Sequence, residues 1–245
     1  MQSVSATRPA DCKKTLASFE QAYIYTGLEE AWKRVIGLVV QPSVEFGDSD
    51  IFVYARGKAA DLTGSLKNWP QGVFEGHSTD YQPREALRAM VEDGIAILKV
   101  GPTLTFGLRE ALFSLEMMEK ELYFGRSCHF SDFQEVFEQA MLDQPANWQK
   151  HYHGDAFERH FARKSSYSDR ARYYLPDSKV DESIGILIRN INDVPIPLTL
   201  LSQYMPLQCQ SVQAGHIKPT AEDLIQDHIG NNIDDYLYAV DPIII

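Results

Sequence analysis

Three short apolar runs in the first half of the chain alternate with longer stretches that have helical spacing. The runs are Val35–Val40, Gly72–Phe74 and Ile95–Val100. Each run is followed by a polar cluster and then by a stretch in which apolar residues recur every third or fourth position. Short apolar runs bounded by turn residues are typical of strands buried on both faces, as in parallel sheets. The pattern therefore predicts repeated units of strand, turn and helix.

The clearest helix is expected after the third apolar run. Its apolar residues recur at helical spacing and form one continuous stripe. The stripe consists of Leu108, Ala111, Leu112, Leu115, Met118 and Leu122. Near the start of the chain, residues 17–34 also have helical spacing, which Gly27 interrupts. We expect the helices to bury their apolar stripes against the strands and against one another.

Polar residues ahead of several helical stretches are expected to cap them. Thr79 or Asp80 precedes the helix after the second run, and Ser131 with Gln134 forms a capping-box pattern farther along. Thr220 stands at the same position before the last helix. Side-chain oxygens at these positions accept hydrogen bonds from the first free backbone N–H groups of a helix.

The succession of strand, polar turn and helix is the repeating unit of a (β/α) barrel, in which chemistry gathers at the carboxyl ends of the strands. We expect an α/β fold in which residues 17–125 form a TIM-barrel portion. Residues 1–16 are expected to be a polar, irregular lead-in, and residues 126–245 a mainly helical C-terminal region of the same domain. A complete barrel has more strands than this, so a portion would have open edges that favour association.

Charge and composition narrow the expected partners. The chain has 23 basic and 34 acidic residues and a formal net charge of −11. Such a surface repels nucleic acids and anionic membranes, so neither is an expected partner. No apolar run approaches the roughly 20 residues of a membrane span, and the first residues lack a signal-peptide core. Cys12, Cys128 and Cys209 are widely spaced, which predicts no disulfide framework. We expect a soluble cytoplasmic protein.

Several longer motifs resemble those of one protein family. They read EGHSTDYQ (75–82), ILKVGPTLTF (97–106) followed by LREALFSL, YSDRARYY (167–174) and PIPLTLLSQYMPLQ (195–208). In these motifs the chain resembles the GatZ/KbaZ family, the accessory subunits of class II D-tagatose-1,6-bisphosphate aldolases. The resemblance extends from about Ala17 to about Tyr236. Members of the family are longer, so we expect this chain to correspond to the C-terminal portion, with the last three strands of the barrel.

The resemblance implies an interaction role. Such a subunit supports the activity and stability of a separate catalytic aldolase subunit in galactitol and N-acetylgalactosamine (D-tagatose 6-phosphate) catabolism. The zinc ion is then expected in the catalytic partner, with no cofactor or metal in this chain. The family is also labelled tagatose-6-phosphate kinase, but the sequence has neither a GxGxxG nor a GxxxxGK[ST] nucleotide-binding motif. Self-association and binding of a sugar phosphate are further possibilities.

Glu75, His77 and Lys99 are the candidates for catalysis. Alternation along the strands predicts that Glu75 and His77 share one face and that Lys99 faces the same interior from the neighbouring strand. A buried charge is tolerated when it is paired, so one hypothesis is a structural ion pair between Lys99 and Glu75. The alternative is a desolvated Lys99 that forms a Schiff base with a ketose carbonyl.

The polar turns after the strands are candidates for binding phosphate. Ser78, Thr79 and Asp80 follow the second run, and Gly101 and Thr103 follow the third. Hydroxyl and free N–H groups at the start of a helix bind anions, and phosphate sites of barrels often lie at this end. The alternative is that Ser78, Thr79 and Asp80 simply cap the next helix.

Two groups of residues in the second half of the chain are weaker candidates for binding a ligand or a metal ion. Arg170 and Arg172 lie among aromatic residues and are candidates for binding phosphate or sugar; alternatively they pair with Asp169 or Asp177. His151-x-His153, with Asp155 and His160 nearby, has the residue types of a metal site. Surface histidines without a metal are the simpler interpretation, so no metal is expected here.

Overall fold

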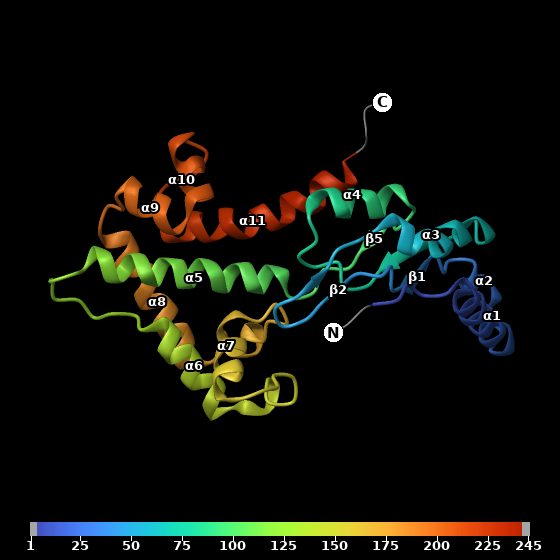
Figure 1. Cartoon of the computed structure of the whole chain (residues 1–245), viewed down its shortest axis with the longest axis horizontal. Coiled ribbons are helices and arrows are strands. Elements are labelled where there is room, and N and C mark those ends of the chain that lie inside the picture. The colour runs from blue at the N-terminus through green and yellow to red at the C-terminus, as the bar shows by residue number, and fades with distance from the viewer. Residues whose placement is uncertain (1–3, 242–245) are drawn as a thin grey trace. The chain divides into compact units, whose positions relative to one another are not determined.

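The computed structural model describes residues 4–241, which form two compact units whose elements are labelled in Figure 1. The first unit comprises Met1–Gly101 and Asp234–Ile245, and the second comprises Pro102–Ile233. We expected boundaries at residues 16 and 125, whereas the chain passes from one unit to the other after Gly101 and after Ile233. Residues 1–3 of the expected lead-in and residues 242–245 of the expected helical region lie outside the described residues. The fold is mixed α/β, rich in helices and built on a small parallel sheet.

The first unit contains a three-stranded parallel sheet with the order β1-β4-β5. The strands are β1 (Gly37–Val40), β4 (Val73–Gly76) and β5 (Ile97–Leu98). All three apolar runs therefore contain strands, although each strand is shorter than or shifted from its run. The parallel pairing follows from the intervening helices, since a chain that returns through a helix re-enters the sheet in the same direction.

The two faces of this sheet differ in burial. Leu38, Val40 and Phe74 point to the hydrophobic core of the unit, where Val40 and Phe74 are each 2% exposed. On the opposite face, Val39, Glu75 and Ile97 lie in register across the three strands. Val39 is 56% exposed and Ile97 is 40% exposed. This opposite face is called the open face below.

The remaining elements of the first unit surround the sheet. The chain enters through α1 (Pro9–Tyr25) and α2 (Glu29–Trp32). The irregular lead-in expected up to residue 16 is thus wrong, because α1 begins at Pro9, whereas the interruption of the helical stretch at Gly27 is confirmed. Pro9 begins α1 because the first turn of a helix has no use for its missing N–H, and Gly27, at φ 70°, follows its end. The others are β2 (Glu45–Phe46), β3 (Ile51–Phe52), α3 (Arg56–Gly64), η1 (Ser65–Asn68) and α4 (Arg84–Glu92).

The second unit is helical. Its elements are α5 (Thr103–Leu122), α6 (Phe133–Asp143), η2 (Pro145–Asn147), α7 (Ala156–Ser165), η3 (Ala171–Tyr173), α8 (Ser178–Asp193), α9 (Leu198–Tyr204), α10 (Pro206–Gln213) and the larger part of α11 (Ala221–Val240). The predicted stripe of α5 is confirmed, since Leu112, Leu115 and Met118 are fully buried in the core of this unit. The last turns of α11 belong to the first unit.

Two of the three predicted helix caps are wrong. The helix after β4 begins only at Arg84, behind Pro83, so neither Thr79 nor Asp80 caps it. At α6 the N-cap is Asp132, in the left-handed region at φ 46°, while Ser131 donates its hydroxyl to Glu119. The cap at the last helix is confirmed by the hydrogen bond from the Asp223 N–H to Thr220 Oγ1 (3.3 Å). The polar side chains that local spacing predicted as caps of these two helices instead make contacts with residues elsewhere in the fold.

Candidate functional site

The expected site lies in the first unit, where β4 and β5 end. The Lys99 N–H donates to the Gly76 carbonyl (3.1 Å), and Thr79 Oγ1 donates to the Lys99 carbonyl (2.9 Å). Ser78 and Tyr81 adopt left-handed backbone angles (φ 59° and 61°), which non-glycine residues seldom do. The turn after β4 is therefore folded back against the end of β5 and held there by backbone and side-chain bonds.

Asp80 is the central polar group of this turn. Its carboxylate is 1% exposed, and both oxygens accept from the Gly101 N–H, at 2.8 and 2.9 Å. A Cβ at Gly101 would lie 3.1 Å from Asp80 Oδ2, so glycine allows this close approach. A phosphate could bind the Gly101 N–H only if Asp80 moved away, because two anions compete for one donor. In this structure these two residues fasten the ends of neighbouring strands.

Tyr236 joins the same turn from the far end of the sequence. Its hydroxyl donates to the Thr79 carbonyl at 2.9 Å. Burial raises the pKa of Tyr236 to about 12, and the nearby Asp80 carboxylate acts in the same direction. Sequence reasoning missed this residue, because its only local signal is its place in the last helix. Of the expected phosphate ligands, Ser78, Thr79 and Asp80 lie together, and all three are buried.

The three catalytic candidates lie near this turn, but the predicted ion pair is absent. Lys99 and His77 are exposed and Glu75 is half-buried. Neither the Lys99 amine nor the Glu75 carboxylate forms an ion pair or hydrogen bond with any residue among 4–241. The register explains this: Glu75 lies opposite Ile97, whereas Lys99 is two residues farther along the chain, just after β5, and its side chain is exposed. The expected structural pairing of Lys99 with Glu75 is therefore wrong, and the Schiff-base alternative stays a hypothesis.

The remaining expected ligands are in the second unit. Thr103 begins α5, and its hydroxyl donates to Asn232 of α11 at 3.4 Å. Arg172 donates to the Tyr173 hydroxyl at 3.1 Å, and the Arg170 guanidinium lies 5.9 Å from the centre of the same ring. The expectation that these arginines pair with Asp169 is wrong, because Asp169 pairs with a different arginine. Asp177 caps α8 through the Lys179 N–H.

Arg109 is the partner of Asp169. Its Nε lies 2.8 Å from Asp169 Oδ1, and both side chains are 3% exposed. The Arg109 guanidinium also lies 4.5 Å from the centre of the Phe106 ring and donates to the Lys164 carbonyl. Sequence reasoning missed the pair, although a signal existed: Arg109 lies one turn before Leu112 of the apolar stripe. A charge at a core position needs a buried counter-charge.

Asp155 and His160 of the histidine-rich stretch make structural contacts. Asp155 caps α7 together with Glu158, and His160 Nδ1 lies 2.7 Å from Glu138 Oε1. Within residues 4–241, no three side chains of the His, Cys, Asp and Glu types are grouped so that they could hold a metal ion. Among the same residues, no helix has both the length and the apolar character needed to cross a membrane.

Comparisons with known proteins place these features in a family. The model of the D-tagatose-1,6-bisphosphate aldolase subunit GatZ/KbaZ-like family matches residues 1–241. A similar solved structure is that of a probable tagatose 6 phosphate kinase from Sinorhizobium meliloti 1021, at 41% sequence identity and a TM-score of 0.90. The match covers 96% of this chain and 60% of that protein. The chain thus spans about 60% of the length of the similar protein.

Proposed function

Because the chain belongs to the D-tagatose-1,6-bisphosphate aldolase subunit GatZ/KbaZ-like family, we propose that it acts as an accessory subunit of such an aldolase. In this role it binds a separate catalytic class II subunit and supports its activity and stability in D-tagatose 6-phosphate catabolism. The catalytic partner, which holds the zinc ion, performs the carbon–carbon cleavage. The match along nearly the whole chain is the observation that carries the proposal.

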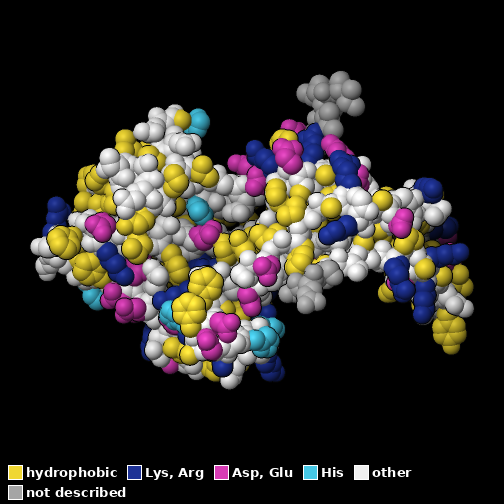
Figure 2. Space-filling view, viewed as in Figure 1, with side chains coloured by type: hydrophobic (Ala, Val, Ile, Leu, Met, Phe, Trp, Pro, Cys, Tyr) yellow, Lys and Arg dark blue, Asp and Glu magenta, His cyan; other side chains and the backbone are white. Residues whose placement is uncertain are grey.

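The apolar surface of the first unit supports an interaction role. Val39 and Ile97 are exposed on the open face, and β1 and β5 are the edge strands of the sheet among the described residues. On α1, Phe19, Ile24 and Tyr25 are 57%, 53% and 91% exposed, and Figure 2 shows apolar side chains at the surface there. Exposed apolar residues next to open strand edges favour association with another polypeptide.

The same observations support a barrel origin for the sheet. Its strands are parallel and neighbouring in space, and β4, α4 and β5 form one strand–helix–strand unit. We infer that the three strands are a portion of a (β/α) barrel whose interior is the open face. Glu75 and Lys99 would then face that interior, close to the polar turns at the strand ends.

The experiment that tests the accessory role is thermal inactivation of a class II tagatose-bisphosphate aldolase with and without a molar excess of this chain. A partner that binds only the folded enzyme stabilises it by about 2.7 kcal/mol at about 100 times its dissociation constant. We expect slower inactivation, co-elution on size exclusion, and no cleavage by the chain alone. The variant Ile97→Lys should lose the effect, whereas Met117→Lys, an exposed change on α5 in the second unit, should retain it. Unchanged inactivation without co-elution would refute the accessory role.

A second candidate function is aldolase chemistry by the chain itself. Among residues 4–241 no ion pair or hydrogen bond holds the Lys99 amine, which leaves it free to reach a substrate carbonyl, although its exposure to water is contrary to the desolvated amine that the sequence led us to expect. Borohydride trapping with a ketose phosphate tests it. A covalent adduct on Lys99 that is absent in Lys99→Arg would favour this candidate over the accessory role. Consumption of ATP with tagatose 6-phosphate in the same preparation would instead favour a kinase, the activity named for the S. meliloti protein.

A further inference from the structure

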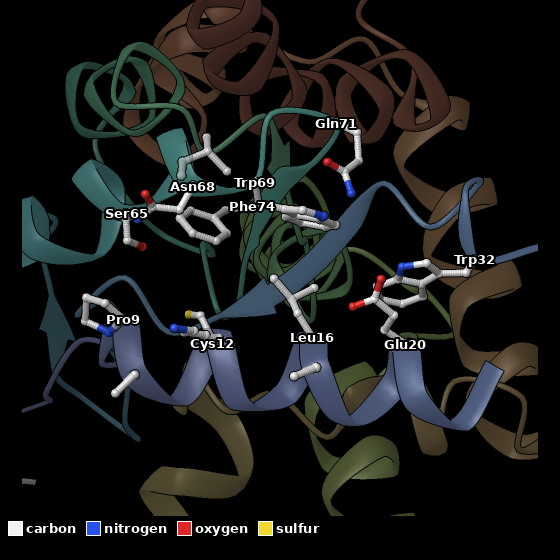
Figure 3. A pocket seen from close by; sticks show the side chains of 14 residues that line it. Pro9, Cys12, Leu16, Glu20, Trp32, Ser65, Asn68, Trp69, Gln71 and Phe74 are labelled. Atoms are coloured by element: carbon white, nitrogen blue, oxygen red, sulfur yellow. The ribbon is translucent and has the colours of Figure 1, made fainter. Parts of the chain in front are cut away.

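A cavity in the first unit lies away from the strand-end turns, between α1 and the segment that contains η1 (Figure 3). Its volume is about 710 Å³. Small-molecule sites in proteins typically have volumes of about 300–1,000 Å³. The side chains that line it and carry the argument are Lys13, Leu16, Glu20, Trp32, Trp69 and Phe74. All of its lining residues lie between positions 9 and 74, so the cavity is formed within one unit.

Trp69 has an unsatisfied donor in the wall of this cavity. The side chain is 7% exposed, and its Nε1 makes no hydrogen bond with any described residue. Figure 3 shows the nitrogen on the side of the indole that faces Trp32 and Gln71. By contrast, Trp148 in the second unit donates its Nε1 to the Met141 carbonyl at 2.6 Å. Because buried polar groups in proteins are nearly always bonded, the free Trp69 N–H indicates a missing acceptor.

The position of the Trp69 ring is fixed by its neighbours. A Cβ at Gly72 would lie 2.1 Å from Trp69 Cε3, so the indole packs directly on the glycine backbone. The turn that places it is closed by the hydrogen bond from the Gly72 N–H to the Trp69 carbonyl (3.0 Å). A donor held on a rigid ring loses little conformational entropy when it binds an acceptor.

The lining also specifies the chemistry of an occupant. Trp32, Trp69 and Phe74 provide aromatic surface, and Leu16 adds aliphatic surface. The charged residues in the lining are Lys13 and Glu20, which are opposite in sign and do not pair with each other. Ser65, Asn68 and Gln71 add uncharged polar groups, so the lining carries no net charge and favours an uncharged occupant over a sugar phosphate. An uncharged, flat molecule with a single acceptor matches these groups.

We propose that this cavity binds a small, uncharged aromatic compound whose carbonyl oxygen accepts a hydrogen bond from Trp69 Nε1. The site differs in location and in chemistry from the strand-end turns, and the proposal does not depend on the accessory role.

NMR of the tryptophan indole N–H groups in the full chain tests the proposal, because the chain has 3 tryptophans and each gives one signal. The signals are assigned from the Trp32→Phe, Trp69→Phe and Trp148→Phe variants. Indanone is the probe, and indane, which lacks the carbonyl, is the matched control. We expect indanone to shift the Trp69 and Trp32 signals saturably and to leave the Trp148 signal in place. Its affinity should exceed that of indane about tenfold, as expected for one hydrogen bond to a buried donor.

Two variants separate the hydrogen bond from the cavity itself. Trp69→Phe keeps an aromatic wall but removes the donor, so indanone should then bind only as well as indane, as reported by the Trp32 signal. Ala17→Phe, a change at the exposed surface of α1, places a ring in the cavity and should weaken both probes. Equal affinities of the two probes for the unmodified chain would overturn the proposal. So would the absence of a saturable Trp69 shift up to the solubility limit of indanone.

Discussion

At the scale of single residues, charged groups at core positions are the main feature that local patterns did not predict. Arg109, Glu116 and Glu119 lie on the buried side of α5, and all three are at most 3% exposed. Each has partners from other segments: Asp169 binds Arg109, the Gln134 N–H donates to Glu116, and Ser131 donates to Glu119. Burial raises the pKa of the Asp169 carboxyl, and the Arg109 guanidinium opposes that rise. These pairs connect the loops of the second unit to α5.

We predict that Arg109→Met destabilises the second unit by about 3–5 kcal/mol, because it leaves the Asp169 carboxylate buried without a counter-charge. The double variant Arg109→Met with Asp169→Leu should regain much of this loss, since no buried charge then remains. Urea unfolding of the two single variants and the double variant measures the coupling. If the double variant loses as much as the two singles combined, the pair does not act as a unit.

The buried phenol of Tyr236 gives a prediction of pH dependence. Its pKa is raised to about 12 by burial, above the value of about 10 in an unfolded chain. The protonated form is thus favoured in the folded state, and its contribution to stability is complete below about pH 10. That contribution is lost as the pH rises from there to about 12. Urea unfolding at a series of alkaline pH values should show the unmodified chain losing stability relative to Tyr236→Phe. A stability difference that stays constant up to pH 12 contradicts the burial of this group.

At the scale of elements, α5 (Thr103–Leu122) shows how a helix is specified by its pattern and completed by its surroundings. Leu112, Leu115 and Met118 face the core, whereas Met117 on the same helix is 39% exposed. The stripe is continuous, so it predicted both the helix and its buried face. The start of α6 depended instead on Glu116 and Glu119, whose carboxylates accept the Gln134 and Ser131 N–H groups. A side chain from another helix thus replaced the predicted capping box.

We predict that Leu115→Ala lowers the free energy of unfolding by about 2–5 kcal/mol, because it removes buried methyl groups and leaves a cavity in the core. Met117→Ala is the matched control on the same helix and should change stability by less than about 1 kcal/mol. Urea unfolding followed through Trp148, which lies in this core, reports both. Equal effects of the two changes would mean that α5 does not pack by this face.

At the scale of the whole molecule, each of the two units has its own hydrophobic core, and the described residues of the first unit bury the sheet on one face only. Val40 of β1 is 2% exposed, while its neighbour Val39 is 56% exposed on the open face. Burial of only one face is unusual for a parallel sheet, which is normally covered on both faces, and here the exposed face carries Val39 and Ile97 on either side of Glu75. The open face is therefore a surface of this unit at which another polypeptide is expected to bind.

We predict that the chain self-associates in the absence of an aldolase subunit and that Val39→Lys reduces this association. A lysine at position 39 on the open face must stay hydrated, so burying it between two chains is unfavourable. Analytical ultracentrifugation over a range of protein concentrations measures the effect, with Met117→Lys in the second unit as the control. A monomer at all concentrations, or equal association of both variants, would show that the open face does not drive self-association.

The sequence by itself determined the three strands of the parallel sheet, the helix α5 and the mixed α/β class of the fold. Apolar runs at 35–40, 72–74 and 95–100 marked the three strands, the stripe from Leu108 to Leu122 marked α5, and the motifs after the strands identified the family. These features depend on spacing along the chain, which backbone geometry converts directly into buried faces. The sequence by itself did not determine which polar side chains form hydrogen bonds or ion pairs with one another.

Only the tertiary structure decided the partners of the polar residues. It placed Asp80 on the Gly101 N–H, brought Tyr236 to Thr79 and paired Arg109 with Asp169, and it left Lys99 apart from Glu75. A hydrogen bond or ion pair forms within a few ångströms, so strand register and the path of the chain decide between neighbours that the sequence treats alike. The physical reason is that hydrophobic burial is set by periodicity, whereas polar pairing is set by position in space.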